Sequence, residues 1–241
     1  MTKIGIIAGD GSLPKFIGDS LIKKNYDIMY FLLNNNRKIF LNDKFVNIDI
    51  LSIKNIFKIL DSNNIKNIIF AGSIKRPSIK DIGFDLQTFL LAKNLLLEKK
   101  GDNDLLVSIK KYFESKGYTF FNWTKYCKEL FSTETYLSKF KPSKIANLNL
   151  KKAKLIYENY KKLDVGQSIV IQNQLVLGLE AIEGTDQLLQ RCFSYKRKGD
   201  KGILLKFSKK NQSNLIDIPL IGIETIFNLK KYNYEGVYLQ K

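Results

Sequence analysis

The alternation of short apolar runs with amphipathic stretches in the first half of the chain constrains the fold more than any other feature. Residues 3–9 (KIGIIAG), 27–33 (DIMYFLL) and 67–72 (NIIFAG) are nearly continuous in apolar residues, as strands buried on both faces of a parallel sheet are. Between these runs, apolar residues recur at helical spacing, over about residues 13–24 and 52–60. The alternation predicts a parallel α/β sheet.

The second half of the chain predicts a separate and smaller α/β domain. A polar segment with a proline, residues 131–147, interrupts the pattern and is interpreted as a linker. We therefore expect two domains, a Rossmann-like N-terminal domain over residues 1–135 and a C-terminal domain over residues 146–241. The elements expected after the linker are a helix over about residues 143–162, a hairpin over 168–181 that turns at Gln172–Asn173, a helix from about Asp186, a strand over 202–207, a helix from about Ile223 and a strand over 236–240.

Charge and residue usage narrow the chemistry. The chain carries 40 Lys and Arg against 23 Asp and Glu, a formal net charge of +17. This charge indicates either an anionic partner or a general bias toward lysine. Histidine is absent from the sequence, so catalysis would rest on carboxylates, Lys, Tyr, Ser or Thr, or on a hard metal ion held by oxygen atoms. The sequence has no signal-peptide pattern and no apolar run long enough to span a bilayer, so we expect a cytoplasmic protein.

A glycine-rich turn follows the first predicted strand. Gly9, Asp10 and Gly11 form a G-x-G pattern, but Pro14 stands where a dinucleotide fingerprint has its third glycine. The acidic residue expected about 20 positions further on is also missing, which argues against NAD. The turn is interpreted either as a ligand site with free backbone N–H groups at a helix N-terminus or simply as a tight turn.

A basic segment follows the predicted strand at residues 67–72. It contains Lys75 and Arg76, and it should open at the same edge of the sheet as the glycine-rich turn. These cations would face an anionic ligand, with arginine offering a bidentate contact to phosphate, or they would belong to a solvated basic loop.

Three carboxylates gather in the stretch LEAIEGTDQLLQR, which is unusual in so basic a chain. Glu180, Glu183 and Asp186 fall within seven residues, with Thr185 as a plausible helix N-cap. Asp186 would then be favoured by the helix dipole. This structural role explains Thr185 and Asp186 but not Glu183 or Gly184, and the short acidic loop could instead hold a hard divalent cation through oxygen atoms. With Glu183 and Asp186, Asp217, the lone charge in an apolar run, is the third candidate ligand.

Six segments that run through nearly the whole chain carry a family resemblance: GIIAGDGSLP, AGSIKRPS, GDNDLL, DVGQSIVIQNQLVLGLEAIEGTDQLLQR, KGILLKFSKKNQ and DIPLIGIETI. In these segments and their order, the chain resembles the LpxI-type UDP-2,3-diacylglucosamine pyrophosphatases. The resemblance implies a lipid A pathway enzyme of Gram-negative bacteria that releases UMP and the diacylated glucosamine 1-phosphate. It also implies two domains that enclose the ligand, dependence on Mg²⁺ or Mn²⁺, and a catalytic aspartate at Asp217.

From the resemblance and the residues themselves together, we assign roles to individual positions. Asp217, Asp186 and Glu183 would serve catalysis and hold the metal. The residues expected to bind substrate are Gly9, Asp10, Gly11, Lys75, Arg76, Thr185, Lys206, Lys209 and Gln212. Expected partners are the UDP-linked diacylated glucosamine lipid, the inner-membrane surface, where the protein would be peripheral, and a second copy in a homodimer.

The chain departs from the family pattern just before Asp217. Lys210, Ser213 and Leu215 stand where the family usually has proline, aspartate and arginine. A relative that binds the lipid without cleaving it therefore stays open as an alternative. A basic nucleic-acid-binding protein is the other rival, but we expect no nucleic-acid partner because the sequence contains no recognised nucleic-acid motif.

Overall fold

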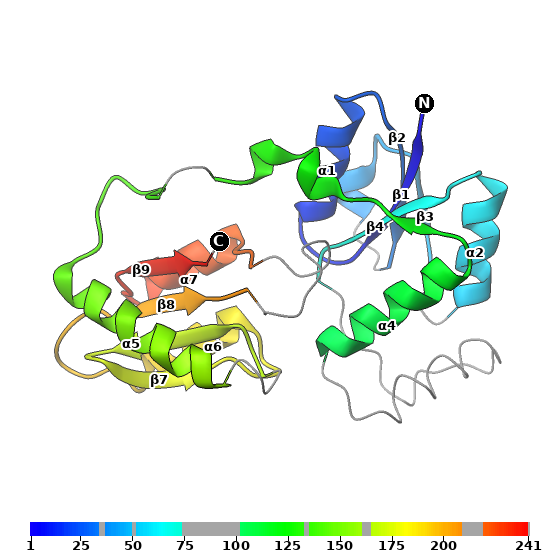
Figure 1. Ribbon diagram of the computed structural model, residues 1–241. Coiled ribbons are helices and arrows are strands. Elements are labelled where there is room, and N and C mark those ends of the chain that lie inside the picture. Colours follow the sequence, from blue (N-terminus) through cyan, green and yellow to red (C-terminus); the bar gives the residue numbers. More distant parts are fainter. Residues whose placement is uncertain are drawn as a thin grey trace. The chain divides into compact units, whose positions relative to one another are not determined.

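The computed structural model describes residues 1–33, 37–49, 52–73, 102–132, 135–160, 165–208 and 219–240. It contains two units, one made of the described residues up to 132 and the other of the described residues from 135 onward (Figure 1). Each unit has its own sheet with helices packed on it. The predicted two-domain α/β architecture is confirmed.

The N-terminal unit is built on a parallel sheet of five strands in the order β3-β2-β1-β4-β5. All four strand pairs are parallel, as the alternation of buried strands and helices predicted. The chain crosses from one side of β1 to the other, which is the topology of a doubly wound sheet. The strands are β1 (Lys3–Ala8), β2 (Asp27–Leu32), β3 (Phe45–Asn47), β4 (Asn67–Ala71) and β5 (Thr119–Phe120).

Helices cover both faces of this sheet. Phe31 packs in one cluster with Leu60 and Phe113 on one face. The neighbouring Tyr30 points to the other face, where a methyl group added at Gly18 of α1 would overlap its hydroxyl. The helices are α1 (Leu13–Ile22) on the Tyr30 face, α2 (Ile53–Ser62) and α4 (Asp102–Ser115) on the Phe31 face, and the short 3₁₀ turns Arg37–Phe40, Trp123–Lys125 and Lys128–Leu130.

The C-terminal unit has a mixed sheet of four strands in the order β7-β6-β8-β9. Strand β6 is antiparallel to β7 and β8, and β8 is parallel to β9. The predicted hairpin is present, but its turn lies one residue later, because Asn173 and Gln174 both adopt positive φ angles of 50° and 60°. The strands are β6 (Ser168–Gln172), β7 (Leu175–Leu179), β8 (Ile203–Lys206) and β9 (Gly236–Leu239).

Alternate residues of β8 face different helices. Leu205 packs in a cluster with Ala153 and Tyr157 of α5 (Lys144–Tyr160). Leu204 packs on the other face with residues of α6 (Thr185–Phe193) and α7 (Ile223–Lys231). Helix α5 therefore covers one face of the sheet, and α6 and α7 cover the other. By the same alternation, Lys206 belongs to the face of α6 and α7.

Helix α5 is fixed to the sheet by a buried asparagine. The Asn149 side-chain oxygen accepts a hydrogen bond from the Gln174 N–H at 2.7 Å, and its amide donates to Asp200 at 3.1 Å. Asn149 is fully buried, so this pairing sets which side of α5 faces the hairpin.

Among the described helices, none is long and apolar enough to cross a membrane.

Candidate functional site

Several elements of the C-terminal unit meet at one end of its sheet. Ser168, the first residue of β6, pairs with Lys206, the last residue of β8. Lys206 in turn pairs with Leu239, the last residue of β9. Helices α6 and α7 follow strands that end here, so both begin at this end of the sheet. The chain leaves the described residues after Ser208, directly beyond β8, and re-enters them at Pro219, shortly before α7.

A series of hydrogen-bonded polar side chains lies at this end of the sheet, on the face that α6 and α7 cover. The Lys206 ammonium donates to the Thr185 hydroxyl at 3.0 Å, and that hydroxyl donates to the Glu180 carboxylate at 2.8 Å. The other Glu180 oxygen accepts the Gln167 N–H at 2.9 Å. Glu180 and Thr185 are only 9% and 8% exposed, so the carboxylate is buried but fully partnered. A partly buried lysine is thereby held at the beginning of α6.

Thr185 is not the N-cap that the sequence predicts. The N-cap of α6 is Gly184, with a positive φ of 80°, and Thr185 is the first helical residue. No side-chain hydrogen bond caps this helix, because its N-cap residue, Gly184, has no side chain; the Thr185 hydroxyl is engaged by Glu180 and Lys206. The first-turn position of Asp186 is confirmed.

Glu183 is held by an ion pair. Arg191 donates to its carboxylate at 2.6 Å, and the Ala181 N–H donates to the other oxygen at 3.1 Å. Partial burial raises the pKa of the Glu183 carboxyl, but hydrogen bonds from Arg191 and from backbone N–H groups outweigh it, so that pKa lies below its usual value. Glu183 is therefore ionised at neutral pH and already faces one cation.

Asp186 connects the two helices of this face. One of its carboxylate oxygens accepts a hydrogen bond from Asn228 of α7 at 3.2 Å. Among the described residues, no group of three or more acidic or cysteine side chains is close enough to hold a metal ion. Asp217, the other acid predicted to hold a metal, lies outside the described residues.

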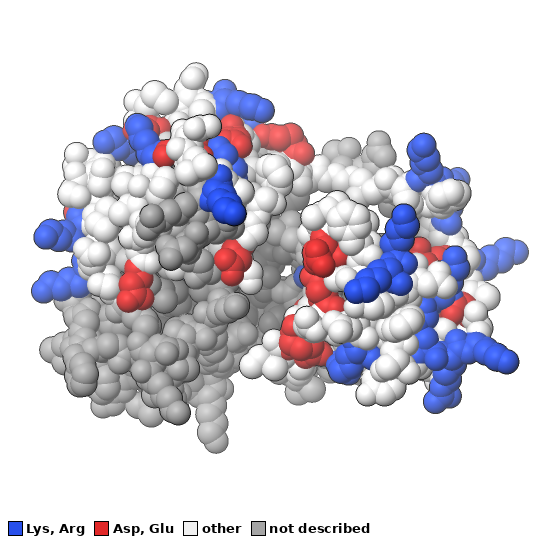
Figure 2. Space-filling view, turned by 180° about the vertical axis from the view of Figure 1, so that it is seen from behind, with Lys and Arg blue, Asp and Glu red and all other residues white. Residues whose placement is uncertain are grey.

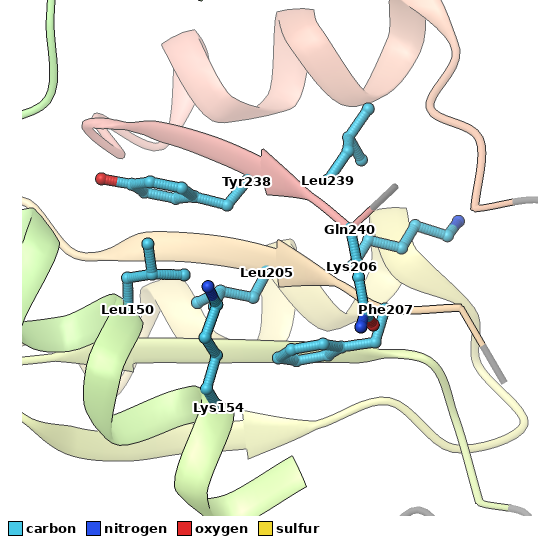
Figure 3. Close-up of a pocket in the computed structure, with 8 residues that line it drawn as sticks. All are labelled: Leu150, Lys154, Leu205, Lys206, Phe207, Tyr238, Leu239 and Gln240. Atoms are coloured by element: carbon cyan, nitrogen blue, oxygen red, sulfur yellow. The ribbon is translucent and has the colours of Figure 1, made fainter. Parts of the chain in front are cut away.

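A small apolar cavity of about 220 Å³ opens on the opposite face at the same end of the sheet (Figure 3). The Phe207 ring stacks on Tyr157 of α5 with ring centroids 3.9 Å apart, which fixes one wall. The Lys206 side chain extends away from Leu150 and Lys154, in keeping with its bond to Thr185 on the other face. The cavity is lined by Leu150, Lys154, Leu205, Lys206, Phe207, Tyr238, Leu239 and Gln240.

The glycine-rich turn of the N-terminal unit is engaged with the segment after β4. The Gly9 N–H donates to the Ala71 carbonyl at 2.9 Å, and Asp10 and Ser73 exchange two backbone hydrogen bonds of 2.7 and 2.9 Å. The two segments therefore meet at one edge of the sheet, as expected. The N–H groups of Gly9 and Asp10 are not free for a ligand, however, because they are used in this pairing. Gly11, with φ of 92°, is exposed.

The structure brings together some of the residues predicted for the site. Thr185 and Lys206 are in contact, and Glu183 and Asp186 flank them at the start of α6. Gly9, Asp10 and Gly11 belong to the N-terminal unit. The remaining predicted residues, Lys75, Arg76, Lys209, Gln212 and Asp217, lie outside the described residues.

Three side chains at this end were not predicted as partners. Arg191 neutralises Glu183, Asn228 contacts Asp186, and Ser168 lies 3.3 Å from the Thr185 hydroxyl. Glu180 was noticed as one of the clustered acids, but not as the buried acceptor that positions Thr185. Arg191 lies two turns after Glu183, and this spacing was the one sequence signal for the ion pair.

The buried position of Glu180 leads to a prediction about stability. Glu180→Ala would leave the Gln167 N–H and the Thr185 hydroxyl without their acceptor, and we expect it to lower the free energy of unfolding by about 2–4 kcal/mol. Glu183→Ala removes an acid of the same stretch whose ion pair is partly exposed, and its expected cost is about 1 kcal/mol or less. Urea unfolding of the two variants beside the wild type measures both values. Equal losses in the two variants would show that the buried hydrogen bonds of Glu180 contribute no more to stability than the partly exposed ion pair of Glu183.

In a comparison with known proteins, both halves of the chain match domains of the same family. One family model, the LpxI N-terminal domain, matches residues 3–130, and another, the LpxI C-terminal domain, matches residues 133–241. A curated relative, the UDP-2,3-diacylglucosamine pyrophosphatase LpxI of Caulobacter vibrioides, is 27% identical over 246 residues. That match covers 98% of this chain and 88% of the relative.

Proposed function

Because the chain belongs to the LpxI family, we propose that it hydrolyses the diphosphate of UDP-2,3-diacylglucosamine, giving UMP and 2,3-diacylglucosamine 1-phosphate. In this reaction water adds across one P–O bond of the diphosphate bridge. A new P–O bond forms to the water oxygen, the bridging oxygen leaves with the other phosphate, and a protein base accepts the water proton. The product would enter lipid A synthesis.

The observation that carries this proposal is the match to both LpxI domains across nearly the whole chain. A relative with this named activity aligns with 98% of the chain. An identity of 27% does not by itself transfer a substrate, and the chemistry of the described residues therefore has to support the assignment.

In the C-terminal unit, the end of the sheet at which β8 and β9 end has a cation on one face and an apolar cavity on the other, a combination that would bind an amphiphilic anion. On one face, Lys206 is held at the beginning of α6, where a cation and helix N–H groups would favour a phosphate. On the other face of the same strand, β8, an apolar cavity is lined by Leu205 and Phe207. We propose that Thr185 and Lys206 contact the phosphate and that the cavity receives part of an acyl chain.

Asp217 is the residue proposed for the chemical step, as a ligand for a divalent cation or as the base that activates water. Asp186 is proposed as its partner, because one of its carboxylate oxygens is not used by Asn228. Glu183 is proposed in a supporting role, since Arg191 already neutralises it. A bound Mg²⁺ or Mn²⁺ would offset the negative charge of the diphosphate in the transition state.

The remaining predicted residues are proposed as contacts to the rest of the ligand. Lys209 and Gln212 follow Lys206 in the segment after β8, and their side chains would reach phosphate oxygens. In the N-terminal unit, Gly9, Asp10 and Gly11, together with Lys75 and Arg76, are proposed to bind the nucleotide. The exposed Gly11 is the part of this turn best suited to a ligand, because the N–H groups of Gly9 and Asp10 are taken.

Two alternatives are separated from hydrolysis by one experiment. The departures from the family pattern at Ser213 and Leu215 favour a relative that binds lipid without cleaving it, and the charge of +17 favours a nucleic-acid-binding protein. We expect the purified protein to consume a large molar excess of UDP-2,3-diacylglucosamine in the presence of Mg²⁺. Tight binding of the substrate without turnover would establish the non-catalytic alternative. Sequence-specific nucleic-acid binding at ~200 mM salt, without turnover, would establish the other.

A further inference from the structure

Residues 135–157 form a strongly basic stretch with no acidic residue. The stretch comprises the segment before α5 and most of that helix, and the first acid after it is Glu158. Its helical part lies on one face of the unit, because α5 packs on that face of the sheet. The stretch contains six lysines, namely Lys139, Lys141, Lys144, Lys151, Lys152 and Lys154.

Large apolar side chains are exposed among these lysines. Ile145, Leu148 and Leu155 of α5 are 49%, 45% and 66% exposed, and Phe140 before the helix is 84% exposed. At 3.6 residues per turn, the three helix residues and three of the lysines fall within about 120° around α5. The opposite side of the helix, with Ala146 and Ala153, is buried on the sheet. We call this outward surface the α5 face, made of Lys144, Ile145, Leu148, Lys151, Lys152 and Leu155.

The other face of the C-terminal unit differs in charge. Seen from the side of α6 and α7, acidic and basic side chains are intermixed on this unit (Figure 2). Helix α7 also exposes apolar residues, Ile223 and Phe227, but Glu224 lies in its first turn, Asp186 lies in the first turn of neighbouring α6, and Glu183 precedes that helix. An anionic surface would be repelled by these acids, whereas the six residues of the α5 face include three lysines and no acid, and the one acid of this helix, Glu158, lies in its last turn.

We propose that the α5 face is a docking surface for a lipid bilayer that contains anionic lipids. Lysines interleaved with exposed apolar side chains on one side of a helix are typical of interfacial helices, whose apolar residues enter the head-group region while the cations meet lipid phosphates. Exposed apolar patches of this kind are otherwise uncommon on monomeric proteins. A nucleic acid would contact the lysines through its phosphates but would leave Leu148 and Leu155 exposed to water, so it accounts for only part of this surface.

The docking surface adjoins the apolar cavity at the end of the sheet. Leu150 and Lys154 of α5 line that cavity, so its α5 wall and the docking surface are parts of the same helix. Docking would bring this wall close to the bilayer from which a diacylated substrate has to be taken. This last step rests on the proposed function, whereas the docking itself does not.

Vesicle co-sedimentation tests the docking surface with the full-length protein. We expect binding to vesicles of phosphatidylcholine with phosphatidylglycerol, and weak binding to phosphatidylcholine alone. The triple variant Lys144→Glu, Lys151→Glu, Lys152→Glu should bind the anionic vesicles ~100-fold less tightly, because each lysine near an anionic membrane contributes substantially. The matched control Lys54→Glu, Lys58→Glu, Lys111→Glu changes the net charge equally at exposed positions of the N-terminal unit and should bind nearly as the wild type.

A second pair of variants tests the apolar part. Leu148→Gln with Leu155→Gln should weaken vesicle binding ~10-fold while keeping its dependence on anionic lipid, because the buried hydrocarbon contact is lost. The control Ile22→Gln with Leu41→Gln changes side chains of matching exposure, 45% and 71%, in the N-terminal unit, and it should have no effect. Thermal melts confirm that each variant is folded.

Three results would overturn the proposal. Equal losses in the two triple variants would mean that net charge, and not the α5 face, drives binding. Unchanged vesicle binding by the leucine variants would leave only a general electrostatic contact. Self-association that the leucine variants abolish, without vesicle binding, would assign the face to a second copy of the chain. UMP release measured in detergent micelles separates this proposal from the enzymatic one, since wild-type turnover there does not need docking.

Discussion

Asp217→Ala is expected to lower turnover of UDP-2,3-diacylglucosamine by ~1,000-fold or more, which corresponds to about 4 kcal/mol of transition-state stabilisation. The expectation follows from the role proposed for this carboxylate, which would hold a divalent cation or take the proton of the attacking water. Substrate binding should be largely retained, because the uridine and the acyl chains supply most of the affinity. The free energy of unfolding should hold or rise, since an acid that shares a metal with Asp186 would be repelled by it when metal is absent.

A nearby acid provides the control for this variant. Glu224 is exposed in the first turn of α7, shortly after Asp217 in the chain, and Glu224→Ala should keep turnover near that of the wild type. Asp186→Asn should lose less turnover than Asp217→Ala but should bind Mg²⁺ more weakly. If these acids serve only the helix, Asp186→Asn would instead cost about 1 kcal/mol of stability at unchanged turnover. A wild-type rate from folded Asp217→Ala would remove the catalytic assignment.

Exhaustive removal of divalent cations is the second change expected to have a large effect. We expect turnover to fall to background with EDTA and to return when Mg²⁺ or Mn²⁺ is added, because a histidine-free set of carboxylates favours hard cations bound through oxygen. Turnover that is unchanged after complete chelation would rule out the metal role of Asp217, Asp186 and Glu183.

The thermal melt provides an independent readout of the same metal. In the described part of the C-terminal unit, the carboxylates are held by Arg191, Asn228 and Thr185, and no three acids form a cluster. The fold of these parts should therefore not need a metal, and EDTA alone should leave the melting temperature unchanged. Saturating Mg²⁺ should raise the melting temperature of the wild type, by linkage, and should raise that of Asp217→Ala less. A large loss of stability with EDTA would indicate a structural metal instead.

The sheet of the N-terminal unit was predictable because its signal is local. The runs at residues 3–9, 27–33 and 67–72 became β1, β2 and β4, and the parallel order followed from the helical stretches between them. Local signals also located the start of α7 at Ile223 and the hairpin of β6 and β7. The hairpin turn was one residue off, since the sequence does not show that both Asn173 and Gln174 take positive φ.

The contacts at the candidate site were less predictable because they join residues that are distant in sequence. A threonine before an aspartate at the start of a helix is typical of an N-cap, and this pattern led to the wrong role for Thr185. Its hydroxyl is instead held by Glu180 and Lys206, which the β6–β7 hairpin and β8 bring to the same sheet end. Strand alternation could have placed Lys206 on the side of α6, but only once the pairing of β8 with β6 was known.

The most direct test of the proposed activity quantifies both products in one time course. Wild-type protein is incubated with UDP-2,3-diacylglucosamine and Mg²⁺, and UMP, UDP and the lipid products are measured together by mass spectrometry. Hydrolysis of the diphosphate predicts UMP and 2,3-diacylglucosamine 1-phosphate in equal amounts, rising at the same rate as the substrate falls. Release of UDP with the unphosphorylated sugar would mean that the glycosidic bond is broken instead, and it would contradict the assignment, as would an unchanged substrate.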